Sequence, residues 1–219
     1  MPCVKPGHFH KICKMIQQDK TKLEDNKRTC TWFGSYGIVP HLAELVSATK
    51  IVEIGVAYGY HADFLCTVLP NIQYIGVDPY QANYDDDDIF CQDVQKLFGE
   101  VSAQAAMDRL FNVVSSNLLG LNGRAQLIRE KSWLAASQFA DASLDLVYID
   151  GDHTYEGVCR DLAAWYPKVK KGGVICGDDI GWVGVKRAVD EFFLTLGAEY
   201  QIITKNGFEN MPAFYFIVD

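Results

Sequence analysis

The sequence of 219 residues contains no run of about 18 apolar residues, so we expect no membrane-spanning helix and no membrane partner. Its first residues lack the apolar core of a signal peptide. The seven cysteines are odd in number, and no pair has the CxxC spacing, which disfavours both a disulfide framework and a zinc site. Together these absences predict a chain that works in a reducing, cytoplasmic compartment.

Positive charge is also scarce. Lys and Arg number 20 against 28 Asp and Glu, which gives a net charge of −8. A chain of this charge repels phosphate backbones, so we expect no nucleic-acid partner. The apolar content of 49% and charged content of 22% are typical of a packed globular protein and exclude a disordered chain.

Short apolar runs alternate with segments of helical period, which is the pattern of an α/β fold. Helices are indicated between the runs, for example over 155–165 and 185–193. The last two runs have no helix between them, so we expect them to pair antiparallel. The strands are expected at 51–54, 74–77, 125–128, 144–149, 174–176, 200–204 and 214–218.

Two regions stand outside this alternation. Residues 1–48 contain helical segments before the first strand, and residues 81–120 separate the second and third strands by more than a compact connection needs. The second region opens with four aspartates, 85–88, and continues as one long amphipathic helix or two. We expect a single domain, 1–219, with 1–48 as an N-terminal helical cap and 81–120 as a helical insertion.

Two glycines, Gly55 and Gly59, follow the first expected strand. In open parallel sheets, ligands bind at the carboxyl ends of the strands. Asp78 ends the second strand, 23 residues after Gly55, where a carboxylate accepts hydrogen bonds from a ribose diol. The GxxxG spacing departs from the dinucleotide pattern GxGxxG, and Glu53 would repel a pyrophosphate but could help to hold a cationic ligand. The pattern therefore favours a nucleoside without phosphates over a nicotinamide dinucleotide.

A second polar cluster follows two neighbouring strands. Asp150, Asp152 and His153 come after the fourth strand, and Asp178 and Asp179 come after the fifth. Carboxylates that converge at one sheet edge suit a hard cation such as Mg²⁺ or Mn²⁺. The alternative is that Asp178 and Asp179 cap the next helix and that Asp152 sits in a turn. His153 could take a proton near neutral pH, or it could simply face solvent at a helix start.

The segment Val52–His61, followed by Gly76–Pro79, resembles the class I S-adenosylmethionine-dependent methyltransferases. More narrowly, it is similar to the catechol O-methyltransferase-like group and its relatives that methylate sugars of macrolides and glycans. The resemblance covers about 50–219. We therefore expect a Rossmann-like, seven-stranded mixed sheet of order 3-2-1-4-5-7-6, with an antiparallel last strand, helices on both faces and a helical cap.

The resemblance also implies roles for individual residues. Gly55 and Gly59 would line the methionine part of the cofactor, and Asp78 would bind the ribose. Asp179 and His153 stand where catechol enzymes have Asn and Lys, and both resemble the sugar-modifying branch. The cofactor-binding set is Glu53, Gly55, Gly59, Tyr60, His61, Asp78, Ser132 and Trp133, in which Tyr60 and His61 flank the methionine carboxylate and Ser132 and Trp133 contact the adenine. For Trp133 a core position is the alternative. The implied metal ligands are Asp150, Asp178 and Asp179.

The predicted reaction is transfer of a methyl group from S-adenosylmethionine to a sugar hydroxyl of a glycan or glycoside. His153 and Asp150 are the predicted catalytic residues, and Mg²⁺ assists. The alternatives are a catechol or small-phenol O-methyltransferase and a catalytically silent cofactor-binding module. The apolar cap would build the acceptor pocket, or it would serve as a homodimer surface. Its aromatic residues, which fit no single ligand, are Trp32, Phe33, Tyr36, Tyr84 and Trp182.

Overall fold

The computed structural model describes residues 6–30, 36–83, 89–204 and 212–219, with side chains from residue 14 onward. The chain divides into two compact units. The first comprises 1–30 and 80–120, and the second comprises 31–79 and 121–219. The predicted cap is thus split, because its first part groups with the insertion and its last part groups with the sheet.

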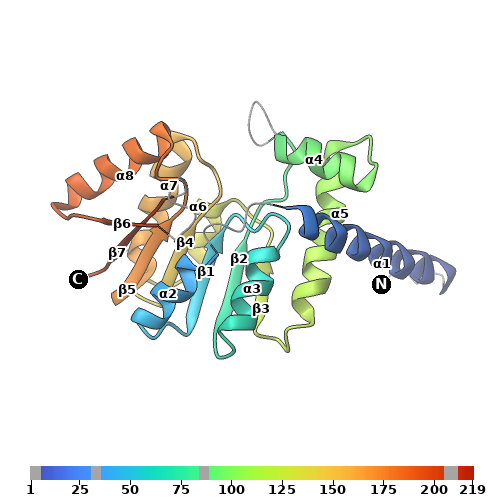
Figure 1. The fold of residues 1–219 in the computed structure, drawn as a ribbon, viewed down its shortest axis with the longest axis horizontal. Helices are drawn as coiled ribbons and strands as arrows, with labels where there is room; N and C mark the ends of the chain where they lie inside the picture. The colour runs from blue at the N-terminus through green and yellow to red at the C-terminus, as the bar shows by residue number, and fades with distance from the viewer. Residues whose placement is uncertain (1–5, 31–35, 84–88, 205–211) are drawn as a thin grey trace. The chain divides into compact units, whose positions relative to one another are not determined.

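The second unit is built on a seven-stranded sheet of order β3-β2-β1-β4-β5-β7-β6 (Figure 1). The first five strands run parallel, and β7 is antiparallel to both of its neighbours. The predicted order and the antiparallel last strand are therefore confirmed. The strands are β1 (Lys50–Ile54), β2 (Gln73–Val77), β3 (Ala125–Ile128), β4 (Leu144–Ile149), β5 (Val169–Gly177), β6 (Gln201–Ile203) and β7 (Ala213–Ile217).

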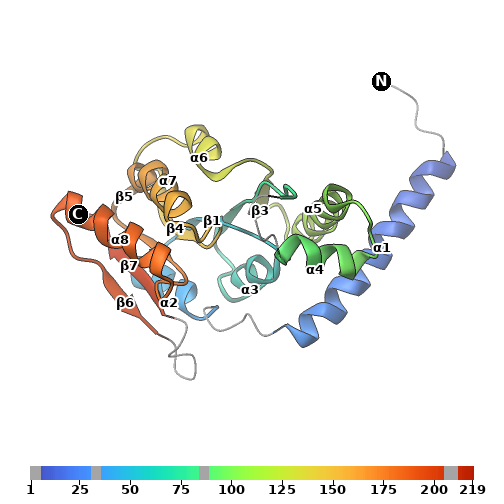
Figure 2. The same cartoon turned by 90° about the horizontal axis from the view of Figure 1, so that it is seen from above.

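Helices cover both faces of this sheet. Figure 2 shows α2 and α3 on one side of the strands and α6 and α7 on the other, with α8 packed beside α7. Their bounds are α2 (Ile38–Leu45), α3 (Tyr60–Val68), α6 (Ser132–Ala135), α7 (Tyr155–Trp165) and α8 (Val183–Leu196), with short 3₁₀ turns at Ala136–Gln138 and Tyr166–Lys168. Residues of β4 are buried along its whole length, as expected for a central strand covered on both faces.

Asp145 ties the starts of three strands together. Its Oδ2 accepts hydrogen bonds from the Thr49 backbone at 2.7 Å and hydroxyl at 2.9 Å and from Lys50 N at 2.8 Å, and its Oδ1 lies 2.6 Å from Lys170 Nζ. Burial opposes the charge of this carboxyl, but the Lys170 ammonium and the Thr49 and Lys50 donors outweigh it and lower its pKa to about 2. This anchor fixes the end of the sheet at which the parallel strands begin.

The first unit contains α1 (Pro6–Thr29), α4 (Ile89–Phe98) and α5 (Ala103–Leu119), so the predicted insertion forms two helices. Arg109 on α5 donates to both Asp19 oxygens on α1, from Nε at 3.1 Å and from Nη2 at 2.5 Å. Its Nη1 reaches Glu100 Oε1 at 2.7 Å. Arg109 Nη1 and Lys22 Nζ each donate to the carbonyl oxygen of Phe98 at the end of α4, at 3.1 Å. Because Asp19 is almost fully buried, these contacts form a polar link among the three helices.

Several features of the sequence lie outside the described residues, namely the aspartate run 85–88 and the side chains of Cys3, Cys13, Trp32, Phe33 and Tyr84. The described cysteines, at 30, 66, 91, 159 and 176, are free thiols. Within the described ranges, no helix has the length and apolarity needed to cross a bilayer.

Candidate active site

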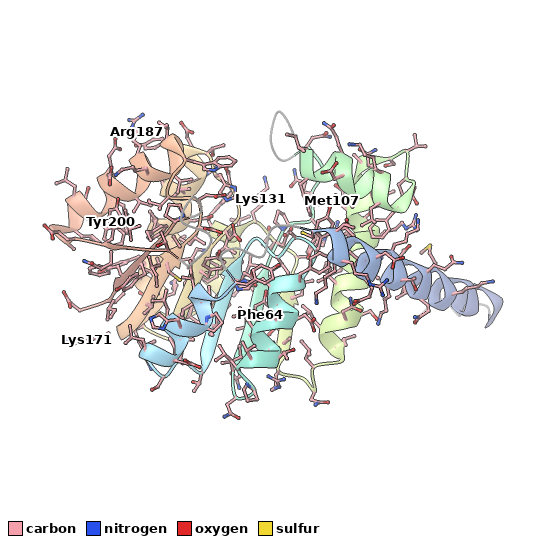
Figure 3. All side chains as sticks on the ribbon, in the orientation of Figure 1. Phe64, Met107, Lys131, Lys171, Arg187 and Tyr200 are labelled. Atoms are coloured by element: carbon pink, nitrogen blue, oxygen red, sulfur yellow. The ribbon has the colours of Figure 1, made fainter. Side chains whose placement is uncertain are left out.

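Both predicted polar clusters lie at one edge of the sheet, where the parallel strands end. In Figure 3, Lys131, which follows β3, marks this carboxyl edge, and Lys171, near the start of β5, marks the opposite edge. The two clusters meet at Gly55. This residue has φ +86°, and a Cβ placed on it would lie 2.0 Å from the carbonyl oxygen of Asp150. Only glycine fits here, since the turn after β1 runs directly against the end of β4.

The carboxylate of Asp78 holds this turn. Its Oδ2 accepts hydrogen bonds from Val56 N and Ala57 N, each at 3.0 Å, and the residue is 8% exposed. Ala57 has φ +47°, a conformation that the two hydrogen bonds help to stabilise. The sequence reasoning missed this link between the end of β2 and the turn after β1, while the predicted ribose contact of Asp78 stays a prediction.

Behind the turn lies a buried polar group centred on Glu53. Its Oε1 is 2.9 Å from His61 Nδ1, and its Oε2 accepts the hydroxyl of Tyr74. The imidazole packs on Tyr36, with ring centroids 4.6 Å apart, and edge-on against Tyr148. His61 Nε2 is buried and has no hydrogen-bond partner among the described residues. A buried nitrogen in this state indicates a place for a ligand atom or a water.

At the same edge, His153 lies between two carboxylates. Its Nε2 is 3.5 Å from Asp150 Oδ1 and 3.2 Å from Asp179 Oδ2. Asp179 has φ +53°, and its backbone N–H donates to Asp178 Oδ1 at 2.9 Å. This local turn directs the Asp179 carboxylate from the end of β5 toward the residue that follows β4. The ring of Trp182 packs against His153 with centroids 5.2 Å apart.

The charged groups in this cluster shift one another's pKa values. Loss of water around Asp150, reinforced by the nearby Asp178 charge, raises its pKa to about 6 although His153 opposes the shift. Burial, followed by repulsion from Asp178, also raises the pKa of Asp179 although His153 again opposes the shift. Burial alone would lower the pKa of His153, but the surrounding carboxylates outweigh it and raise that pKa. The group therefore concentrates negative charge that favours a proton or a cation.

A methyltransferase-domain family model matches residues 52–180, more than half of the chain. This chain belongs to the methyltransferase-domain family. The comparison with curated proteins returns no significant match.

Solved structures agree with this fold. The cofactor-bound protein Rv0187 from MTB is 14% identical, with a TM-score of 0.62 and 99% of each chain covered. A candidate caffeoyl-CoA O-methyltransferase from Staphylococcus aureus is 14% identical, with a TM-score of 0.56 over 83% of this chain and 81% of that one. A TDP-rhamnose 3'-O-methyltransferase of calicheamicin biosynthesis is 16% identical, with a TM-score of 0.52 over 98% and 96%. The chain therefore has the fold of these proteins, and the family match identifies it as a methyltransferase.

One observation indicates a place for a cofactor atom at this edge of the sheet. His61 Nε2, which has no partner among the described residues, lies at the first turn of α3. Gly59, with φ +73°, allows the chain to enter that helix. Tyr60 is buried and stacks with Tyr58, with ring centroids 5.3 Å apart, so its ring contributes to the wall of the turn.

Ser132 and Trp133, the predicted adenine contacts, have side-chain partners in the structure that the residue spacing did not predict. Ser132 is buried, and its hydroxyl accepts the indole N–H of Trp165 at 2.7 Å. Trp133 is half-buried, with the Arg160 guanidinium 4.3 Å from its ring, so it is not a core residue. Ser132 also contacts the carboxyl of Asp161. Burial and the Asp152 charge raise the pKa of Asp161 to about 7, although the hydrogen bond with Ser132 lowers it.

The structure also decides between the alternatives for the acidic residues. Asp152 does sit in a turn, since its Oδ1 accepts Thr154 N at 2.9 Å and its carboxyl group covers Gly157. In contrast, Asp178 and Asp179 do not cap α8. The N-cap of that helix is Trp182, without a side-chain hydrogen bond. The Asp179 carboxylate instead lies against His153, and the Asp178 carboxylate accepts the Asp179 backbone N–H.

The donor chemistry of this cluster suits a hard cation, because the oxygens of Asp150, Asp178 and Asp179 are the ligand type that Mg²⁺ prefers. In the part of the chain that the structure describes, however, no three such side chains are already positioned as a metal-binding group.

Proposed function

We propose that this methyltransferase transfers the methyl group of S-adenosylmethionine to a sugar hydroxyl of a glycan or glycoside. The observation that carries the proposal is the position of His153 between Asp150 and Asp179, next to the Gly55 turn. A sugar hydroxyl is far less acidic than a phenol, so its methylation depends more strongly on a positioned base. A structural neighbour that acts on TDP-rhamnose supports the choice of a sugar.

On the cofactor side, the Gly55 and Gly59 backbone would line the methionine moiety. His61 Nε2 would contact the carboxylate, and Glu53 would hold the imidazole in that orientation through Nδ1. Asp78 would bind the ribose hydroxyls. The adenine would lie against Ser132 and Trp133, as the resemblance implies, while Tyr60 would flank the carboxylate.

On the acceptor side, the hydroxyl oxygen forms a bond to the methyl carbon as the bond from that carbon to the sulfonium sulfur breaks. The hydroxyl proton passes to His153 Nε2. The flanking carboxylates of Asp150 and Asp179 stabilise the imidazolium that results. Most of the rate enhancement comes from holding oxygen, carbon and sulfur in line.

We propose Asp150, Asp178 and Asp179 as ligands for Mg²⁺, with Mn²⁺ as a substitute. The raised pKa values of Asp150 and Asp179 support this, since both carboxyls gain from a nearby positive charge. When bound, the ion would polarise the acceptor hydroxyl and lower its pKa. Self-association through an apolar helix face stays a prediction, which light scattering would test.

Transfer of labelled methyl groups to two acceptors tests this function. Methyl α-L-rhamnopyranoside and catechol are assayed side by side, each with Mg²⁺ and with EDTA. We expect transfer to the glycoside and a lower rate in EDTA. Transfer to catechol alone would identify a phenol methyltransferase, and cofactor binding without transfer to any acceptor would identify a silent binding module.

A further inference from the structure

Trp182 presents a large aromatic surface to solvent beside the proposed base. The residue is 58% exposed, and its ring packs against His153 with centroids 5.2 Å apart and planes tilted by 42°. The other described tryptophans differ, because Trp165 is fully buried and Trp133 is covered by Arg160. An exposed indole next to a reacting group indicates a binding surface rather than a core position.

The position of this indole is fixed by its backbone. Trp182 N donates to the carbonyl oxygen of Asp179 at 2.8 Å, and its own carbonyl accepts the Lys186 N–H at 2.8 Å. A Cβ at Gly184 would lie 3.2 Å from Tyr155 N and 3.4 Å from the carbonyl oxygen of His153. The start of α8 therefore packs closely on the loop that carries His153, which sets the distance between the two rings.

The charges near Trp182 favour a neutral, hydroxyl-rich ligand. The two cations of the first turns of α8 are engaged, Lys186 with Asp190 at 2.7 Å and Arg187 with Glu191 at 2.9 Å. The cluster next to the indole offers carboxylate oxygens instead. Such oxygens accept hydrogen bonds from sugar hydroxyls and repel phosphates and carboxylates.

We propose that Trp182 is an acceptor-binding residue, on whose indole the C–H face of a neutral pyranose ring packs. The hydroxyl groups of the sugar then face His153 and the carboxylates around it. This inference rests on the proposed function and deepens it, because it names an uncharged glycoside as the acceptor class and the residue that selects it. Apolar sugar faces and aromatic rings bury each other's surface without any charge, in the same way as other aromatic contacts.

Steady-state kinetics of Trp182→Ala and Trp182→Phe test the proposal, with methyl α-L-rhamnopyranoside and catechol as probes. For the glycoside we expect KM to rise by about tenfold or more in Trp182→Ala and less in Trp182→Phe, with kcat within about threefold, because binding is lost rather than chemistry. The affinity for S-adenosylhomocysteine should not change. Leu194→Ala, which removes an exposed side chain from the last turn of the same helix, should behave as the wild type. An unchanged KM, or an equal rise for catechol, would overturn the proposal.

A binding measurement separates this inference from the proposed function. The sequence has four tryptophans, so the indole N–H signal of Trp182 is assigned by its loss in Trp182→Phe. The glycoside is then titrated into the wild-type protein saturated with S-adenosylhomocysteine. A shift of this signal supports the binding role even if no methyl group is transferred, an outcome that would sink only the proposed function. No shift up to millimolar glycoside overturns the role of Trp182, whatever the turnover.

Discussion

The imidazole of His153 is flanked by carboxylates from two different strands, Asp150 after β4 and Asp179 after β5. The side chain is only 28% exposed, so these charges act at short range and with little screening. Asp178 supports the arrangement by accepting the Asp179 N–H and thus fixing the turn. The proposed proton acceptor is therefore flanked by two carboxylates that are far apart from each other in the sequence.

Replacing this imidazole tests its role. We expect His153→Ala to lower kcat by about a hundredfold or more, since a positioned base contributes on that scale. Affinity for S-adenosylhomocysteine should stay within about twofold in an equilibrium titration. His41→Ala is the matched control, because His41 is an exposed residue of α2, outside the site. Near-normal turnover of His153→Ala would remove the base from the mechanism.

Asp161, in contrast, is a buried carboxyl whose desolvation and repulsion from Asp152 outweigh its favourable interactions with Ser132 and Arg160. It is 2% exposed, and its Oδ1 has no partner among the described residues. Burial raises its pKa from 3.8 to about 7, so the folded state favours the protonated acid. The resulting penalty is absent below about pH 4, grows as the pH rises toward 7, and is complete above it.

The variant Asp161→Asn should therefore be more stable than the wild type at pH 8, by about 2–4 kcal/mol, and about equal to it at pH 4. Urea unfolding at the two pH values measures the difference. Glu156→Gln, an exposed change on the same helix, should show no such pH dependence. Equal destabilisation at both pH values would mean that Asp161 is a satisfied hydrogen-bonding group instead.

Single residues also show where sequence reasoning stopped. The turn at Gly55 was predictable from a glycine that directly follows a strand, because a turn of this kind depends on the backbone freedom of that one residue. The partners of buried polar groups depend on packing between distant segments. Nothing in the spacing linked Ser132 to Trp165, or Glu53 to His61 and Tyr74.

At the scale of elements, the loop from β4 into α7 explains the local pattern of residues 150–158. Asp152 Oδ1 accepts Thr154 N, and the Thr154 hydroxyl accepts Gly157 N at 3.0 Å to cap α7. A Cβ on Gly157 would lie 2.1 Å from the Asp152 carboxyl carbon. Asp152 and Gly157 are thus a matched pair that holds the loop carrying His153.

Gly157→Ala should displace the Asp152 carboxyl and lower the free energy of unfolding by about 1–2 kcal/mol, the usual loss for a helix cap or a buried hydrogen bond. Because His153 lies between Asp152 and Thr154, kcat should fall as well. Gly181→Ala is the stability control, since among the described residues its Cβ would meet only Pro212, at 3.9 Å. Equal stabilities for the two variants in urea unfolding would contradict the pairing.

Other helices and strands were predictable from the periodicity of apolar residues in the sequence. Apolar residues at helical spacing predicted one or two helices in the insertion, and the structure has two. The lack of a helix between the last two strands predicted their antiparallel pairing. The boundary of the cap was not predictable, because it depends on contacts. Asp19 on α1 binds Arg109 on α5, so α1 groups with the insertion, while α2 groups with the sheet unit.

At the scale of the whole molecule, the strand order brings the ends of β1, β2, β4 and β5 to one edge. That order was predictable because the alternation of strands and helices, together with the resemblance, leaves few topologies. It places the Gly55 turn, the Asp78 carboxylate and the His153 cluster within one unit. We propose that this edge binds S-adenosylmethionine, with a cation beside it.

Melting temperatures with added ligands test this claim most directly. S-adenosylhomocysteine at about a hundred times its dissociation constant should add about 2.7 kcal/mol of stability, which corresponds to a rise of about 5–10 °C for a chain of this size. NAD should have no effect. A further rise with Mg²⁺, reversed by EDTA and absent in Asp179→Asn, would support the carboxylate site. A response to NAD and none to S-adenosylhomocysteine would contradict the account.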